Sequence, residues 1–333
     1  MKICIVGVGA IGGYLGTRLT VAGSAQVCAL ARGATLAALN EQGWRAQVGD
    51  RLLQAPAVAS DQPAALGVQD LLIIAVKATA LSELAPQLSP LIGPDTVLLP
   101  AMNGVPWWFT QGVAELADAR GQWLPLHSVD PGGRIAAALP AEQVLGCVVH
   151  MSCSTSAPGL VQHKMGAGLI VGEPVGGLSE RVERVAGLLR QAGFDVTASA
   201  RVREDIWYKL WGNLTMNPLS AFTGATIDRL LADPQVRDYC SAAMLEAQAI
   251  GARVGCPIAQ TPEDRHAITA RLGAFKSSML QDVEAGRAIE LDAIVGAVHE
   301  LGQRVGVATP HISALLGLTR VFAQQRGLYP PLA

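Results

Sequence analysis

Residues 2–12 read Lys2-Ile3-Cys4-Ile5-Val6-Gly7-Val8-Gly9-Ala10-Ile11-Gly12, and this stretch decides the fold. An apolar run of strand composition leads directly into a G-x-G-x-x-G pattern, and residues 11–22 then have helix composition and end at a glycine. A bare glycine-rich turn can be without chemistry, but the flanking strand and helix favour a dinucleotide site. The first glycine allows a tight turn, the second lets a pyrophosphate approach the backbone, and the third lets helix and strand pack closely. We therefore expect residues 7–12 to bind the cofactor phosphates at a helix N-terminus.

Further apolar runs of strand composition follow in the first half of the chain, at residues 25–30, 71–76, 96–99 and 146–151. Segments of helix composition lie between several of them, and another predicted helix runs from about residue 179 to 193. Strands that are apolar on both faces and alternate with helices indicate a parallel sheet covered on both sides. Residues 1–200 are thus predicted to form an α/β, doubly wound, Rossmann-type domain.

Beyond about residue 201 the strand signal disappears and helix boundaries take over. Three residues that cap helices stand directly before a proline, and three glycines offer matching helix ends: Asp233-Pro234, Thr261-Pro262 and Thr309-Pro310, with Gly255, Gly306 and Gly327. We therefore predict an all-helical C-terminal domain over residues 201–333.

Composition narrows the range of partners. The 333 residues hold 25 Lys and Arg against 27 Asp and Glu, a net charge of −2. Without a basic excess or a basic run, the chain lacks the electrostatic footprint of a nucleic-acid or anionic-membrane protein. The longest uncharged stretch, 96–114, contains Pro100, Asn103 and Pro106 and is not a membrane helix. We expect a cytoplasmic protein with a small-molecule partner and no metal, since neither the scattered cysteines nor the histidines have ligand spacing.

The end of the second predicted strand bears on which nicotinamide is bound. An NAD enzyme usually presents Asp or Glu there to the ribose hydroxyls, whereas this strand ends in Arg32 and the next acidic residue is Glu41. We therefore expect no acidic group near Arg32 that would repel a 2′-phosphate. Arg32 itself is placed to pair with that phosphate, which predicts NADPH. The alternative is that Arg32 is an ordinary solvated arginine.

Residues 206–218 are apolar and aromatic, yet Lys209, Asn213 and Asn217 recur every four residues and share one helical face. Pro218 predicts a kink or an end of this helix. A single lysine here could reach out to solvent along its own stem. Three polar groups in a row, each needing a partner, favour a cleft lined by hydrogen-bonding groups.

With these residues the chain resembles the ketopantoate reductase (2-dehydropantoate 2-reductase) family over nearly its whole length. The resemblance rests on the following motifs: Gly7-x-Gly9-x-x-Gly12, Arg32, Val76-Lys77-Ala78, Asn103-Gly104, Lys209-x3-Asn213-x3-Asn217-Pro218, Ser277-Ser278-Met279-Leu280-Gln281-Asp282 and Glu290-x-Asp292. It implies NADPH-dependent reduction of 2-dehydropantoate to pantoate, on the route to pantothenate and coenzyme A.

The resemblance also implies roles for single residues. Lys209 would be the general acid, and Glu290 would hold the hydroxyl of the substrate. Asn213, Asn217 and Ser278 would position the substrate, while Asn103 and Lys77 would lie on the cofactor side of the cleft, with Asn103 also near the substrate. Hydride arriving at a ketone carbon leaves negative charge on oxygen, which an ammonium group can stabilise and protonate. From the residues alone there is another interpretation of Glu290 and Asp292. They would be acidic residues at the first turn of a helix over 291–305, where the helix dipole favours negative charge without any catalysis.

Two features bear on the substrate. Met102 precedes Asn103 where a polar residue is more usual in the family, and Trp107-Trp108 follow the same turn. These indoles could reshape the pocket or pack in the domain interface. The alternatives are therefore a related NADP-dependent reductase of another 2-oxo or 3-hydroxy acid, or an NADPH-sensing Rossmann protein without chemistry. A homodimer is the predicted assembly.

Overall fold

The computed structural model describes residues 1–331, and the chain folds as two compact units. The first unit comprises Met1–Met102 and Arg134–Arg203, and the second comprises Asn103–Gly133 and Glu204–Ala333. The sequence predicts one boundary, near residue 200, with residues 103–133 in the first domain. In the structure that segment packs with the helices of the second unit.

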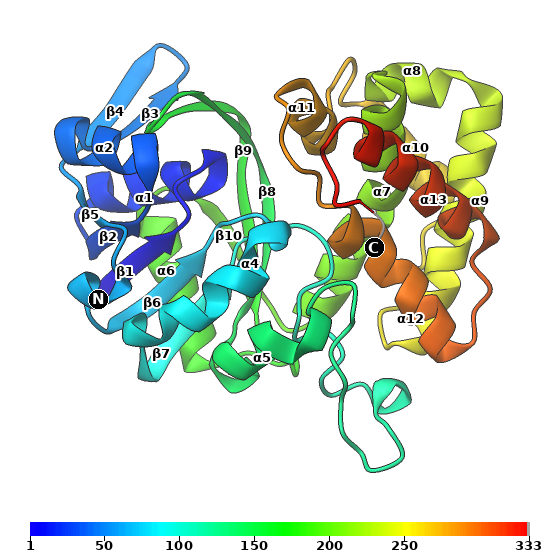
Figure 1. Cartoon of the computed structure of the whole chain (residues 1–333), viewed down its shortest axis with the longest axis horizontal. Coiled ribbons are helices and arrows are strands. Elements are labelled where there is room, and N and C mark those ends of the chain that lie inside the picture. The colour runs from blue at the N-terminus through cyan, green and yellow to red at the C-terminus, as the bar shows by residue number, and fades with distance from the viewer. Residues whose placement is uncertain (332–333) are drawn as a thin grey trace. The chain divides into compact units, whose positions relative to one another are not determined.

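The first unit holds ten strands and six α-helices (Figure 1). The strands are β1 (Lys2–Val6), β2 (Gln26–Leu30), β3 (Trp44–Val48), β4 (Arg51–Ala55), β5 (Val58–Ser60), β6 (Gln69–Ile74), β7 (Ile92–Pro100), β8 (Gly146–Ala157), β9 (Leu160–Gly172) and β10 (Asp195–Ser199). The helices are α1 (Ala10–Ala22), α2 (Gly33–Gln42), α3 (Pro63–Leu66), α4 (Ala78–Leu84), α5 (Arg134–Ala138) and α6 (Glu180–Gln191).

Five strands form a parallel sheet in the order β5-β2-β1-β6-β7. Counted along the chain this is the order 3-2-1-4-5 of a doubly wound dinucleotide-binding sheet, whose switch point lies between β1 and β6. The predicted fold class is confirmed. The apolar run at 146–151 does not extend this sheet: as part of β8 it pairs antiparallel with β9 in a second sheet of order β10-β9-β3-β4.

Helix α1 packs closely enough on its neighbours to fix its N-terminus at the end of β1. Ile3, Ile5 and Ile73 of the sheet are fully buried. A Cβ on Gly16 would lie 2.2 Å from the buried Trp44 ring, so the indole lies directly against the helix backbone. Glycine at this position lets α1 approach β3, and this approach sets where the helix begins relative to the first strand.

A half-buried ion pair joins β9 to α6 in the first unit. Arg181 donates to both carboxylate oxygens of Glu173, at 2.7 and 2.6 Å, and also donates 2.7 Å to the Glu142 carbonyl. Ser179, which caps α6, donates to the same carboxylate at 2.5 Å. Burial by itself raises the pKa of Glu173, but the hydrogen bonds from Arg181 and Ser179 and the Arg181 charge outweigh it and lower this pKa. Glu173 is therefore stabilised as a carboxylate.

Replacing Arg181 by alanine should lower the free energy of unfolding by about 2 kcal/mol at pH 7, because it leaves a buried carboxylate without its cation. The matched control is Arg184→Ala on the exposed side of the same helix, with an expected change within about 0.5 kcal/mol. Because the folded pKa of Glu173 is lowered, this stability is present above the ordinary pKa of 4.5 and is lost as pH falls through the lower, folded value. Urea denaturation of the three proteins from pH 7 down to about pH 3 measures this difference. A difference that does not shrink below pH 4.5 would contradict this account.

The second unit is helical, as predicted. Its α-helices are α7 (Val202–Thr223), α8 (Ile227–Ala232), α9 (Pro234–Arg253), α10 (Pro262–Ala270), α11 (Ser278–Glu284), α12 (Ala297–Val305) and α13 (Pro310–Gln325), and a π-helical turn spans Asp292–Gly296. Helix α7 continues through Pro218 to Thr223, so a helix end at Pro218 is wrong. One missing backbone N–H there is tolerated because the surrounding residues are buried.

The predicted caps of α9 and α10 are present: Asp233 accepts from Gln235 N and Val236 N, and Thr261 forms a capping box with Asp264. The expectation for Thr309 is wrong, because its side chain does not cap α13. Its hydroxyl lies 2.9 Å from His299 Nδ1 instead.

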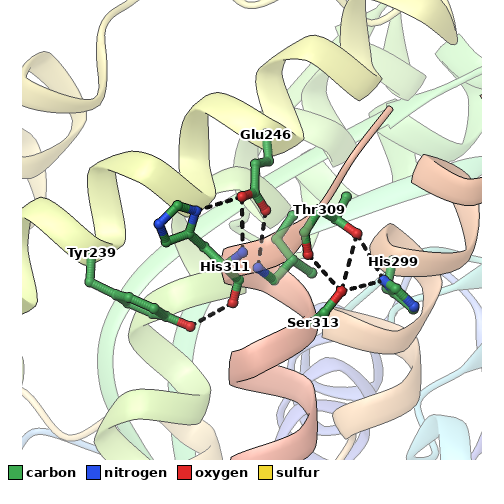
Figure 2. Close-up of polar contacts among 7 residues, drawn as sticks. Tyr239, Glu246, His299, Thr309, His311 and Ser313 are labelled. Carbon is green, nitrogen blue, oxygen red and sulfur yellow. Dashed lines mark hydrogen bonds and ion pairs between the residues drawn. The ribbon is translucent and has the colours of Figure 1, made fainter. Parts of the chain in front are cut away.

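Glu246 of α9 caps α13 in place of Thr309 (Figure 2). Its carboxylate accepts from His311 N at 2.9 Å and from Ile312 N at 3.0 Å, and His311 Nδ1 lies 2.6 Å away. The Tyr239 hydroxyl, also on α9, donates 2.5 Å to the His311 carbonyl. A carboxylate at a helix N-terminus satisfies unpaired N–H groups and is favoured by the helix dipole. These contacts tie the start of α13 to α9.

Segment 103–133 is tied to α12 in the same unit. The Glu300 carboxylate accepts from His127 N and Ser128 N, both at 2.9 Å, and from Ser128 Oγ at 2.7 Å. Arg304 donates to the carbonyls of Leu124 and Pro125 at 2.8 and 2.7 Å. These long-range bonds explain why the segment groups with the helices rather than with the sheet that precedes it. Within residues 1–331, no helix is both long enough and apolar enough to span a bilayer.

Candidate active site

The turn after β1 has the geometry that its glycines predict. Gly7 has φ +88°, and a Cβ there would lie 2.4 Å from Val76 Cγ1. A Cβ on Gly12 would lie 2.0 Å from the Gly7 carbonyl oxygen, so both positions require glycine. On Gly9, in contrast, a Cβ would meet no atom of residues 1–331 within 4 Å. The backbone of Gly9 is therefore open to a ligand.

A cavity of about 520 Å³ lies at this turn, within the first unit. It is lined by Val6, Gly7, Val8, Gly9, Leu30, Ala31, Arg32, Thr35, Asp61, Pro63, Val76, Ala80, Glu83, Leu84 and Gln87. Ala10 and Ile11 form the first turn of α1, whose residues 10–13 carry no acidic side chain. Open N–H groups, the positive end of a helix and a cavity at the switch point of the sheet fit a dinucleotide.

Arg32 lines this cavity from the end of β2, at the N-cap position of α2. Asp61 and Glu83 line it too, so the expectation that no acidic group lies near Arg32 is wrong. Asp61 follows β5, which pairs with β2 so that Ser60 lies opposite Leu30. A strand of three residues leaves almost no pattern in the sequence, so the place of Asp61 in the cavity cannot be predicted from it. Lys77, the N-cap residue of α4, stands between lining residues Val76 and Ala80.

The second unit brings two of the predicted site residues into contact. Lys209 Nζ donates a 2.7 Å hydrogen bond to Asn103 Oδ1, across more than 100 residues of sequence. On α7 the four-residue spacing places Lys209, Asn213 and Asn217 on one face; Lys209 and Asn213 are half-buried, and Asn217 is 6% exposed. The polar stripe is thus largely withdrawn from solvent, which argues against a lysine that merely reaches the surface.

The turn that carries Asn103 is fixed against the π-helical turn Asp292–Gly296. Val105 N donates 2.8 Å to the Ala293 carbonyl. Gly104 has φ +85°, and a Cβ there would lie 2.5 Å from the same carbonyl oxygen. The predicted helix at 291–305 therefore begins with a π-helical turn before α12, and Glu290 directly precedes Leu291, the N-cap of that turn. Short π-helical segments are frequent at functional sites.

The remaining site residues have simpler surroundings. Ser277 is buried and caps α11 by accepting from Leu280 N at 3.0 Å, whereas Ser278 is exposed at the first helical position. Trp107 and Trp108 are 3% and 1% exposed, and the adjacent Phe109 stacks on Trp207 of α7 with ring centroids 5.8 Å apart. The two indoles are thus buried, and the aromatic stack holds this segment against the helix that carries Lys209.

Both halves of the chain match models of one protein family. The family model described as "Ketopantoate reductase PanE/ApbA" matches residues 3–176, and "Ketopantoate reductase PanE/ApbA C terminal" matches residues 201–323. A curated 2-dehydropantoate 2-reductase of Mesorhizobium japonicum is 42% identical over 330 residues, covering 99% of this chain and 100% of that protein.

Two solved structures are similar over almost the full length. A proposed ketopantoate reductase from Ralstonia solanacearum MolK2 is 52% identical with a TM-score of 0.93, covering 98% of this chain and 99% of that one. The 2-dehydropantoate 2-reductase from Geobacter metallireducens GS-15 is 27% identical with a TM-score of 0.81, covering 96% and 99%. With both family models matched in order, and with the cofactor turn and the Lys209–Asn103 pair in place, the chain belongs to the ketopantoate reductase family.

Proposed function

We propose that this protein is an NADP-dependent oxidoreductase that reduces 2-dehydropantoate to pantoate. The observation that carries the proposal is the hydrogen bond from Lys209 to Asn103, which holds an ammonium group on a largely buried polar face. Such a group is suited to an oxygen on which negative charge develops. The 42% identical 2-dehydropantoate 2-reductase supports the substrate.

In this mechanism the nicotinamide, when bound, supplies the hydride. Lys209 stabilises the carbonyl oxygen of the 2-oxo acid and delivers its proton, while the Asn103 amide oxygen holds the ammonium in place. Asn213, Asn217 and Ser278 orient the substrate. Glu290 accepts a hydrogen bond from the substrate hydroxyl. Each of these groups has the donor or acceptor that its role requires.

The cofactor of the proposed reaction is NADPH. Residues 7–12 bind the pyrophosphate, Arg32 binds the 2′-phosphate, and Lys77 and Asn103 contribute from the ends of β6 and β7. Asp61 in the same cavity opposes the phosphate charge, so the preference for NADPH depends on Arg32 outweighing it.

Arg32→Ala should raise the dissociation constant for NADPH by about one to two decades and leave that for NADH nearly unchanged. The reason is that a charge-assisted phosphate contact is worth roughly 1.5–3 kcal/mol. The control is Asp61→Asn, which removes a negative charge from the same cavity. This variant should bind NADPH at least as tightly as the parent. Fluorescence titration of each protein with both nucleotides measures this. Equal binding of NADPH and NADH by the unmutated protein would refute the assignment.

The test of function is oxidation of NADPH in the presence of 2-dehydropantoate, compared with other 2-oxo acids at matched concentrations. Hydroxy acids, including 3-hydroxy acids, are tested in the opposite direction, by reduction of NADP+. The proposal expects the largest kcat/KM with 2-dehydropantoate. Faster turnover of another oxo acid would make the chain a related reductase, and NADPH binding without turnover of any acid would make it a sensor. We also propose that the protein is a cytoplasmic homodimer. Sedimentation equilibrium measures the mass of the assembly directly.

A further inference from the structure

The C-terminal residues contact the chain on both sides of Glu290. Ile289 N donates 3.1 Å to the Leu328 carbonyl, and the Tyr329 hydroxyl donates 2.7 Å to Asp292 Oδ1. Ile289 and Leu328 are 1% and 4% exposed, so the first of these bonds is shielded from water. Glu290 therefore lies in a short stretch that is fastened at the residue before it and at the second residue after it.

The bond between Tyr329 and Asp292 persists over the working range of pH. Burial and the neighbouring Asp292 raise the pKa of Tyr329 to about 12, so the hydroxyl keeps the proton that it donates. Burial also raises the pKa of Asp292, against the lowering effects of the Tyr329 hydrogen bond and of the charges on Arg320 and His127. A half-buried carboxyl group needs such partners, and the Tyr329 hydroxyl is one of them.

The opposite contact of the same π-helical turn is with the Asn103 segment. Ala293, next to Asp292, accepts the hydrogen bond from Val105 N, and Gly104 leaves no room for a side chain against it. The turn Asp292–Gly296 is thus held by Tyr329 through Asp292 and by the Asn103 segment through Ala293. Helix α13, which leads into Leu328 and Tyr329, is itself anchored at its start by Glu246 (Figure 2).

We infer that Tyr329 is a positioning residue: its bond to Asp292, with the Leu328–Ile289 bond, sets the place of the Glu290 carboxylate for the substrate hydroxyl. This inference rests on the proposed function of Glu290. A carboxylate that accepts a hydrogen bond from a substrate hydroxyl has to be held to within a fraction of an ångström. The contacts of Leu328 and Tyr329, one on each side of Glu290, provide this constraint. Because the hydroxyl is already present in the bound oxo acid, the constraint acts on substrate binding more than on the chemical step.

The test uses the full-length protein and Tyr329→Phe, which removes the hydroxyl and keeps the ring. We expect KM for 2-dehydropantoate to rise about tenfold, kcat to change by less than about threefold, and the dissociation constant for NADPH to stay unchanged. The matched control is Tyr239→Phe, which removes the hydroxyl bonded to the start of α13 and should leave KM unchanged. Each variant loses one tyrosine hydrogen bond, Tyr329 to Asp292 or Tyr239 to the His311 carbonyl. Thermal unfolding of both variants measures how much stability each loss costs.

A double-mutant cycle with Glu290→Ala, which removes the acceptor, separates positioning from general packing. If Tyr329 acts through Glu290, the effect of Tyr329→Phe on KM disappears when Glu290 is already alanine. An equal effect in both backgrounds, or an unchanged KM in an active Tyr329→Phe enzyme, overturns the positioning role alone. An unmutated protein that does not turn over 2-dehydropantoate overturns the proposed function, and with it the proposed role of Glu290.

Discussion

Lys209→Ala is expected to lower kcat by two to three decades or more while leaving the dissociation constant for NADPH nearly unchanged. The ammonium interacts with the substrate oxygen most strongly as charge builds there, so its loss raises the barrier above the bound complex. Loss of one preorganised donor costs roughly 3–4 kcal/mol, and loss of the proton adds to this. The cofactor phosphates are expected to bind at residues 7–12 of the first unit, whereas Lys209 belongs to the second.

The matched control for this variant is Lys276→Ala. Lys276 is an exposed lysine of the same unit, paired with Glu284 at 2.6 Å on the surface. Its removal changes net charge by the same amount and should alter kcat by less than about twofold. Stopped-flow measurement under saturating NADPH compares the two. A Lys209→Ala enzyme with kcat within about twofold of the parent would show that the polar stripe on α7 is structural.

The features that the sequence predicted well are those encoded by neighbouring residues. The turn at Gly7 and Gly12 is local, because one glycine needs a positive φ and the other needs room against the turn itself. The caps at Asp233 and Thr261 are local too, since each side chain bonds to backbone within three residues. Such features follow from short-range geometry and were confirmed.

The features that were missed depend on contacts between distant parts of the chain. Asp61 enters the cofactor cavity because β5 pairs with β2, and Glu246 replaces Thr309 as the cap of α13 from a helix more than 60 residues earlier. Pro218 stays inside α7 because its surroundings are buried. Tertiary packing overrides local preference in each case, and no local pattern records it.

The Lys209–Asn103 pair lies between these two cases. The helical spacing of the lysine and the asparagines was readable, and the resemblance to a family suggested that Asn103 belongs to the site. The hydrogen bond itself requires segment 103–133 to pack with the helices of the second unit. That packing depends on hydrogen bonds of the segment to Glu300 and Arg304, far along the chain. The helical face that carries Lys209 could thus be predicted from its spacing, but the packing of segment 103–133 that brings Asn103 to Lys209 could not.

Gly104→Ala should both destabilise the second unit and lower kcat, although it changes no group of the proposed chemistry. A non-glycine residue at positive φ costs about 1–2 kcal/mol, and displacement of the Ala293 backbone, 2.5 Å from the new Cβ, adds about 1–3 kcal/mol. The turn can relieve this clash only by moving Asn103 away from Lys209 or by moving the π-helical turn after Glu290. Because a misplacement of about 1 Å can cost about 10²-fold in rate, we expect a fall in kcat of that order.

Gly112→Ala is the matched control for this last variant. Gly112 lies in the same segment with φ +78°, yet a Cβ there would meet no atom of residues 1–331 within 4 Å. It carries the backbone strain of the first variant without the clash, so it should lose about 1–2 kcal/mol of stability and keep its kcat. Urea denaturation and saturation kinetics on both variants distinguish the two contributions. If the two variants had the same kcat, the contact between Gly104 and Ala293 would have no part in holding Asn103 against Lys209.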